Sequence, residues 1–245
     1  MLVLTDIHMK KIINFHQEIV AEFKKHSGQG TEHSWNSSYL GHTHFTYNTS
    51  NPIKRKIAKE FVKKHKDISN KEFKSLLDAL YTSPSYDEKS FASMLLEYMK
   101  DMRKSLRPKA LDSWLNHLHG WAEVDSLCQS NFKAEEMLEN WDTWNELITK
   151  FSTSKNISKR RASLVLLTGA ISHNNDNRLF KLGMKNIEKL KTEKDILITK
   201  AISWLLRSMV KHHKKAVALY LKQNLDSLPK IAIRETERKI LTGRK

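Results

Sequence analysis

The residues best suited to chemistry are Trp121 and Asp125, which stand four positions apart in the sequence. On a helix, residues at this spacing lie on the same face. A fixed carboxylate can stabilise a positive charge that develops in a transition state. The residues alone leave an alternative open, in which Asp125 forms an ion pair with Arg160 or Arg161 and holds two helices together.

Two further stretches carry cations on otherwise apolar helices. Arg160 and Arg161 stand near the start of the stretch 156–167, which is apolar almost all round beyond them, so we expect a buried helix with a cationic amino end. In the stretch 198–211 the buried face is predicted to hold Ile198, Ile202, Leu205 and Met209. A second face of that stretch holds Lys200, Trp204, Arg207 and Lys211. Aromatic rings flanked by cations suit a nucleic-acid backbone with its sugars and bases.

Asp125 does not fit a phosphate-binding role, because a carboxylate among these cations weakens phosphate binding. Asp125 is therefore the best candidate for a catalytic residue, whereas the cations and the two tryptophans are candidates for binding.

Helices must position these residues, and the apolar spacing is helical nearly everywhere. Similar amphipathic helices are predicted to begin near residues 90, 123, 159, 198 and 230, and more polar helices precede them at 71–80, 134–151 and 178–190. A helix pair roughly every 30 to 40 residues is typical of an α-solenoid, in which corresponding helices line one concave surface. We therefore expect an all-α fold and a single domain over 1–245. An irregular helical bundle is the alternative.

Local signals support these helices. Ser69 with Glu72 and Ser85 with Glu88 have the spacing of a capping box, and Thr192 with Asp195 is a weaker example. One buried stripe is predicted to run through Phe91, Met94, Leu95, Tyr98 and Met102.

The segment 28–50 breaks the helical pattern. It is rich in Ser, Thr, His, Asn and Gly, and it holds Trp35, Tyr39, Phe45 and Tyr47. We predict an irregular loop here, which either has a function or is pinned to the body by its aromatic residues.

The charge of the whole chain points to a polyanionic partner. Lysine and arginine total 43 against 27 acidic residues, a net charge of +16. Such a charge attracts nucleic acid first and anionic membrane second; a protein that is merely basic is the alternative. No apolar run approaches the roughly 20 residues of a membrane span, and the first residues are too short and polar for a signal peptide. We expect a cytoplasmic monomer that acts with the nucleoid and does not bind membranes.

Other kinds of site have little support in the sequence. The one cysteine, Cys128, excludes an internal disulfide and suits a reducing compartment, where we expect it to be a small buried residue. The closest histidine pairs, His42 with His44 and His117 with His119, lack the spacing of helical metal ligands. A glycine-rich phosphate loop is also missing, so we expect no metal, no nucleotide and no other cofactor.

Three motifs resemble the AlkD-type DNA alkylation repair glycosylases in order and separation. They are Trp-x-x-x-Asp at 121–125, Asn-Ile-x-x-x-Arg-Ala at 156–162 and Ala-Ile-x-Trp-x-Leu-Arg at 201–207, with a weaker likeness at 52–59. The likeness runs from about residue 51 to the carboxyl end, and the segment 28–50 lies outside it.

The resemblance implies an α-solenoid of HEAT-like helix pairs that grips double-stranded DNA in a concave basic groove. It also implies excision of positively charged alkylated purines, chiefly 3-methyladenine and 7-methylguanine. Asp125 would then be the catalytic carboxylate, Trp121 and Trp204 would pack against the sugar-phosphate, and Arg161 would contact the phosphate. Arg160 falls where the family has no required cation.

The leading hypothesis is therefore a monofunctional alkylpurine DNA glycosylase of base excision repair. A non-catalytic helical-repeat protein that binds nucleic acid through the same basic face is the first alternative. A protein-binding solenoid scaffold is the second.

Overall fold

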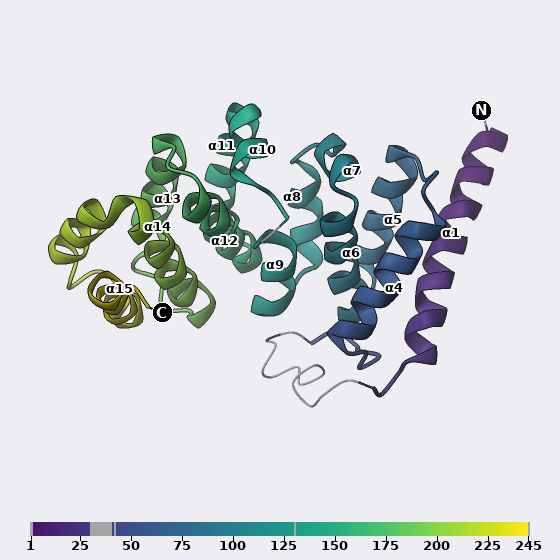
Figure 1. Cartoon of the computed structure of the whole chain (residues 1–245), viewed down its shortest axis with the longest axis horizontal. Helices are drawn as coiled ribbons and strands as arrows, with labels where there is room; N and C mark the ends of the chain where they lie inside the picture. The colour runs from purple at the N-terminus through teal and green to yellow at the C-terminus, as the bar shows by residue number, and fades with distance from the viewer. Residues whose placement is uncertain (1, 30–40, 42, 130, 245) are drawn as a thin grey trace. The chain divides into compact units, whose positions relative to one another are not determined.

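The structure of the chain is a computed structural model that describes residues 2–29, 41, 43–129 and 131–244 (Figure 1). In these residues the regular secondary structure is helical, apart from one isolated parallel bridge between Phe45 and Ser85. The prediction of an all-α fold is confirmed. The chain divides into two compact units, Met1–Leu127 and Cys128–Lys245, and each is described by itself. This division does not test the predicted single domain, because two compact units can belong to one domain.

The first unit is built from helices of very different lengths. They are α1 (Leu2–Lys25), α4 (Asn51–Lys64), α5 (Asn70–Thr82), α6 (Tyr86–Tyr98), α7 (Lys100–Ser105), α8 (Ala110–Trp114), a 3₁₀ turn (Leu115–His117) and α9 (Gly120–Cys128). Helix α4 packs against α6, and α5 packs against both α1 and α6. The centre of this unit is α6, where every side chain from Tyr86 to Leu96 is buried.

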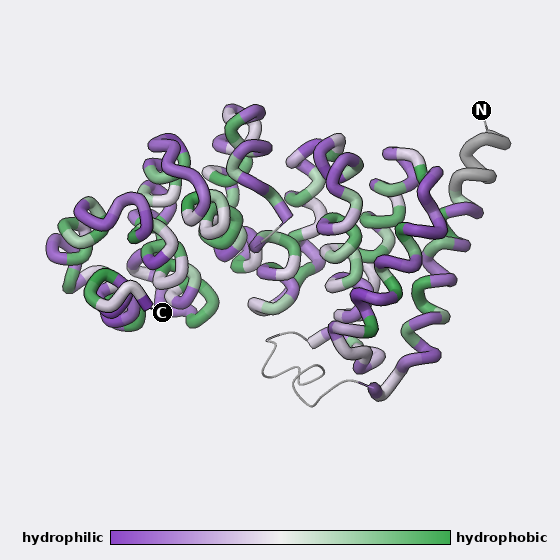
Figure 2. The backbone as a smooth tube through the Cα atoms, in the orientation of Figure 1, coloured by the Kyte–Doolittle hydropathy of each residue, from purple (hydrophilic) through white to green (hydrophobic). Residues whose placement is uncertain are grey.

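The second unit contains α10 (Ala134–Glu139), α11 (Trp141–Phe151), α12 (Ile157–His173), α13 (Asn177–Leu190), α14 (Ile196–Gln223) and α15 (Lys230–Thr242). Helix α14 packs against both α12 and α15. As predicted, α12 is buried almost throughout, from Arg161 to Thr168 and again at Ala170 and Ile171. Figure 2 shows the general pattern, in which hydrophobic and hydrophilic residues alternate along most helices of the chain.

The predicted helix spacing is confirmed. Helices α6, α9, α12, α14 and α15 begin at residues 86, 120, 157, 196 and 230, within four residues of the predicted starts. The preceding helices α5, α11 and α13 pack against α6, α12 and α14 respectively. Since a repeated helix pair is the unit of an α-solenoid, the chain has that organisation. Within the described residues, none of these helices is both long and apolar enough to cross a membrane.

Several local predictions were wrong. The buried stripe of α6 does not continue to Met102, because the backbone leaves the helical region at Met99 (φ −106°, ψ 60°) and α7 follows. The predicted helix over 134–151 is two helices, broken at Asn140 (φ −125°, ψ 48°). Asp195 caps α14 by accepting from the backbone N–H of Leu197, so Thr192 is not the cap.

The other caps are closer to prediction. Ser69 and Glu72 form the complete capping box at the start of α5. Ser85 accepts from the backbone N–H of Glu88, but the Glu88 carboxylate binds other partners. Capping by Ser85 is therefore only half of the predicted box.

Candidate active site

Helix α9 carries Trp121 and Asp125 on one face, as the sequence predicted. Gly120 begins the helix with φ +69°, in the left-handed region that glycine adopts without strain. The Trp121 side chain is half-buried and packs against Tyr86 and Ala122. Asp125 is buried, with 9% of its surface exposed. An aromatic ring and a nearly buried acid therefore share one side of α9.

Glu123 lies on α9 between these two residues and is fully buried. Its Oε1 is 2.7 Å from Nδ1 of His44, and its Oε2 accepts a 2.7 Å hydrogen bond from the backbone N–H of His119, just before the helix. Because both oxygens have partners, this carboxylate holds the start of α9 in place. The sequence reasoning missed Glu123, although its position among the apolar residues of α9 marks it as a charge on a buried face.

His44 and His119 are in direct contact. Their rings stack with centroids 4.6 Å apart and an interplanar angle of 16°. Burial lowers the pKa of His119, and the neighbouring His44 lowers it further, while Glu123 acts in the opposite direction. His119 therefore favours the neutral form beside the His44–Glu123 pair.

The first turn of α6 holds three more buried charges that the sequence reasoning missed. Asp87 pairs with Lys54 of α4 at 3.1 Å, and both side chains are almost completely buried. Glu88 accepts from His16 of α1. Lys89 donates to the backbone carbonyls of Tyr81 and Ser83. Burial lowers the pKa of Lys54, and the ion pair with Asp87 partly offsets this.

Part of the predicted loop 28–50 is described, and it lies against these acids. The Thr46 hydroxyl and the Tyr47 backbone N–H each donate a 2.7 Å hydrogen bond to Oδ2 of Asp87. Phe45 exchanges backbone hydrogen bonds with Pro84 and Tyr86. The aromatic residues Trp35 and Tyr39, together with His42, lie outside the described residues.

In the second unit, the two arginines at the start of α12 have partners in the protein. Asn156 caps the helix by accepting from the backbone N–H groups of Ser158 and Lys159. Arg160 forms a bidentate ion pair with Glu193, in which Nε donates to Oε1 at 2.8 Å and Nη2 donates to Oε2 at 3.1 Å. Arg161 is 4% exposed, and its Nη1 donates to the backbone carbonyl of Leu197. The predicted phosphate contact of Arg161 is not tested by this geometry and stays a prediction.

Helix α14 presents its predicted basic face. The opposing residues Ile198, Ile202, Leu205 and Met209 are fully buried. Lys200 and Lys211 are exposed, while Trp204 and Arg207 are half-buried. Arg207 lies 3.3 Å from the Glu235 carboxylate of α15, which holds its guanidinium close to the helix. Lys200 and Lys211 are thus the cations of this face with the greatest access to a ligand.

The comparisons with known proteins bear on the family. A family model described as "DNA alkylation repair enzyme" matches residues 19–240. The chain belongs to this family. Among solved structures, a predicted DNA alkylation repair enzyme from Enterococcus faecalis is similar in fold, with a TM-score of 0.70 at 18% identity over 87% of this chain and 97% of that one. A search of curated proteins gave no match.

For a DNA alkylation repair enzyme, the two sets of residues have different characters. Helix α9 offers a carboxylate and a tryptophan supported by a buried network of histidines and acids. Helices α12 and α14 offer cations and a tryptophan. Within the described part of the chain, no three His, Cys, Asp or Glu side chains gather as a metal ion would require.

Proposed function

We propose that this DNA alkylation repair enzyme is a monofunctional DNA glycosylase. It hydrolyses the N-glycosidic bond of positively charged alkylated purines, 3-methyladenine and 7-methylguanine, in double-stranded DNA, as the first step of base excision repair. It acts as a cytoplasmic monomer without a cofactor. The observation that carries the proposal is the placement of Asp125 and Trp121 on one face of α9, where Asp125 is 9% exposed.

The reaction needs one carboxylate, and it needs no general acid to protonate the leaving base. Alkylation places a formal positive charge on the purine, so the base takes the electron pair of the breaking N-glycosidic bond and leaves as a neutral molecule. The sugar is left with oxocarbenium character, which a nearby negative charge stabilises. Water then forms the new bond to the anomeric carbon and gives its proton to the carboxylate or to solvent.

Asp125 suits this role better than Glu123, the other acid of α9. Glu123 is sealed from solvent, and its two oxygens are bound to His44 and to the backbone of His119. Asp125 lies half a turn further along α9 and is 9% exposed. We therefore assign the catalytic role to Asp125 and a structural one to Glu123.

The remaining residues are proposed to hold the DNA. Trp121 and Trp204 are half-buried, so each offers part of an indole to a sugar-phosphate backbone. Lys200 and Lys211 offer exposed positive charge, with Arg207 between them on the same face of α14. Arg160 and Arg161 lie at the start of α12; because Arg160 is paired with Glu193 and Arg161 is 4% exposed, they are the less accessible cations of the proposed DNA surface. Contacts of this kind release counterions, so the affinity for DNA falls as the salt concentration rises.

The test is the release of free base from methylated duplex DNA, measured by chromatography. The wild-type enzyme is expected to release a methylated purine. Asp125→Asn keeps the size of the side chain and removes its charge, so it should lower the rate of release by about a hundredfold or more while DNA binding persists. Asp101→Asn is the matched control, because Asp101 is an exposed acid on α7 and its substitution should leave the rate unchanged.

Two other results would count against the proposal. If several cationic lesions give no release while duplex DNA still binds in a salt-dependent way, the protein is a non-catalytic DNA-binding member of the family. If binding to duplex DNA is insensitive to salt, the basic face is not a DNA surface, and a scaffold role is favoured.

A further inference from the structure

A short segment, residues 43–47, is fastened to the start of α6 and to α9 through three buried carboxylates. Thr46 and the backbone of Tyr47 bind Asp87, and the Tyr47 hydroxyl lies 3.4 Å from Glu88. His44 binds Glu123 on α9. The segment is thus fixed at the base of the helix that carries Trp121 and Asp125.

The contact through His44 differs from the others because its partner, Glu123, lies on α9, whereas Asp87 and Glu88 lie on α6. Glu123 has no solvent access, and its other oxygen accepts from the backbone N–H of His119 at the start of α9. Loss of the His44 hydrogen bond would leave one oxygen of a buried carboxylate without this donor, which is unfavourable unless the carboxylate moves or takes a proton. Either response weakens the bond that holds the first turn of α9.

The same part of the chain also approaches Trp121 directly. A methyl group added to Gly41 would lie 3.6 Å from Cδ1 of the Trp121 indole and 3.4 Å from Cα of Gly120. The backbone at Gly41 therefore lies against the first turn of α9. This part of the chain therefore contacts the amino-terminal half of α9 at two separate points, through Gly41 and through His44.

We infer that His44 is a positioning residue of the site, which acts through Glu123 to fix the first turn of α9 and with it Trp121 and Asp125. This inference rests on the proposed function. It also assigns a role to a segment that lies outside the three sequence motifs at 121–125, 156–162 and 201–207. A small displacement of a catalytic group is enough to slow a reaction strongly, by up to about a hundredfold.

The test replaces His44 by asparagine or by glutamine, whose side-chain amides place an N–H donor at different positions. The side-chain N–H of asparagine can take the place of Nδ1 of histidine, whereas that of glutamine lies nearer the place of Nε2. Because the bond to Glu123 uses Nδ1, His44→Asn should behave like wild type. His44→Ala and His44→Gln should lower the single-turnover rate of base release by roughly tenfold to a hundredfold, with the dissociation constant for DNA changed by less than about threefold. Thr46→Val is the matched control, since it removes a hydrogen bond from the same segment to Asp87 and leaves the bond to Glu123 in place.

Hydrogen exchange provides a readout that does not depend on activity. In His44→Ala and His44→Gln the backbone amides of residues 119–123 should exchange faster than in wild type, and in His44→Asn and Thr46→Val they should not. Faster exchange in an enzyme that releases no base would retain the positioning role of His44 while the proposed glycosylase function fails. The positioning role is overturned if His44→Gln keeps both the wild-type rate and the wild-type exchange. Should His44→Ala fail to fold, the comparison of His44→Asn with His44→Gln decides the matter.

Discussion

The guanidinium of Arg161 donates a hydrogen bond to the backbone carbonyl of Leu197, and so joins the amino-terminal part of α12 to the first turn of α14. These two helices carry the cations that we assign to DNA binding in the second unit. Arg161 is 4% exposed, so in this arrangement its charge supports the packing of the two helices.

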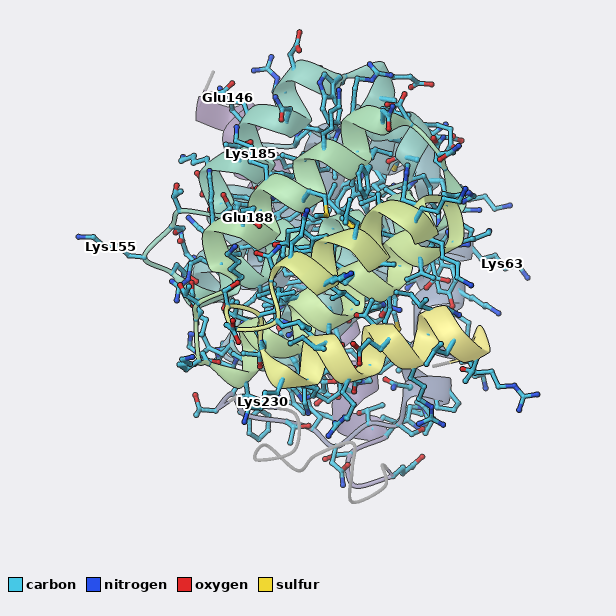
Figure 3. All side chains as sticks on the ribbon, turned by 90° about the vertical axis from the view of Figure 1, so that its left-hand side faces the viewer. Lys63, Glu146, Lys155, Lys185, Glu188 and Lys230 are labelled. Carbon is cyan, nitrogen blue, oxygen red and sulfur yellow. The ribbon has the colours of Figure 1, made fainter. Side chains whose placement is uncertain are left out.

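Replacing Arg161 by alanine should destabilise the second unit. The Leu197 carbonyl would lose this donor, which costs about 1–3 kcal/mol for a buried group. Chemical denaturation measures the change in the free energy of unfolding. Lys155→Ala is the control, because Lys155 extends from the turn before α12 away from the ribbon (Figure 3), and its loss should change that free energy by less than about 0.5 kcal/mol. Equal stability of the two variants would show that the contact contributes nothing.

Lys200 and Lys211 should act on binding without acting on stability. Both are exposed on α14, so Lys200→Ala and Lys211→Ala should leave the thermal unfolding midpoint unchanged. Each should reduce the slope of log affinity against log salt by about 1, because each removes one phosphate contact. Fluorescence anisotropy with a labelled duplex at several salt concentrations measures this slope. An unaltered slope in both variants would contradict the assignment of this face to DNA.

The capping box of α5 predicts a dependence of stability on pH. Burial raises the pKa of Glu72, but the backbone N–H and hydroxyl of Ser69 and the ammonium of Lys11 more than offset this and lower the pKa to about 2. A carboxyl with a depressed pKa in the folded state stabilises the fold above its unfolded pKa, and this contribution is lost as the pH falls. Glu72→Gln should therefore be less stable than wild type at pH 7, by roughly 1 kcal/mol.

This difference should shrink as the pH falls from about 4.5 to 2, where the wild-type carboxyl takes up its proton. Thermal unfolding of both proteins over this range measures it. A gap that stays constant down to pH 2 would mean that the charge of Glu72 does not contribute to the cap.

Replacing only one partner of the buried Lys54–Asp87 ion pair should strongly destabilise the protein. Lys54→Met leaves the Asp87 carboxylate buried without its cation, and such a loss typically destabilises a protein by about 3–5 kcal/mol. Adding Asp87→Asn removes the remaining charge, while its amide oxygen can still accept from Thr46 and Tyr47. The double variant should therefore recover part of the lost stability. A double-mutant cycle in urea measures the coupling, and purely additive effects would show that the pair is not coupled.

The sequence by itself determined the fold class and most of the helices, because those depend on neighbours within a few positions. Ser69 and Glu72 are three residues apart, and the apolar spacing that buries Ile198, Ile202 and Leu205 lies within a single helix. Trp121 and Asp125 could be placed on one face for the same reason. The breaks at Met99 and Asn140 were missed, since the apolar pattern continues across both of them.

Only the tertiary structure decided which buried charges meet. His44 and Glu123 are separated by 79 residues, Arg161 and Leu197 by 36, and nothing in the spacing of either pair relates one partner to the other. A buried charge must find a partner wherever the packing of helices brings one, because an unpaired charge in the interior is strongly unfavourable. The sequence therefore indicated which side chains could do chemistry, whereas the packing of the first unit decided which side chains hold them in place.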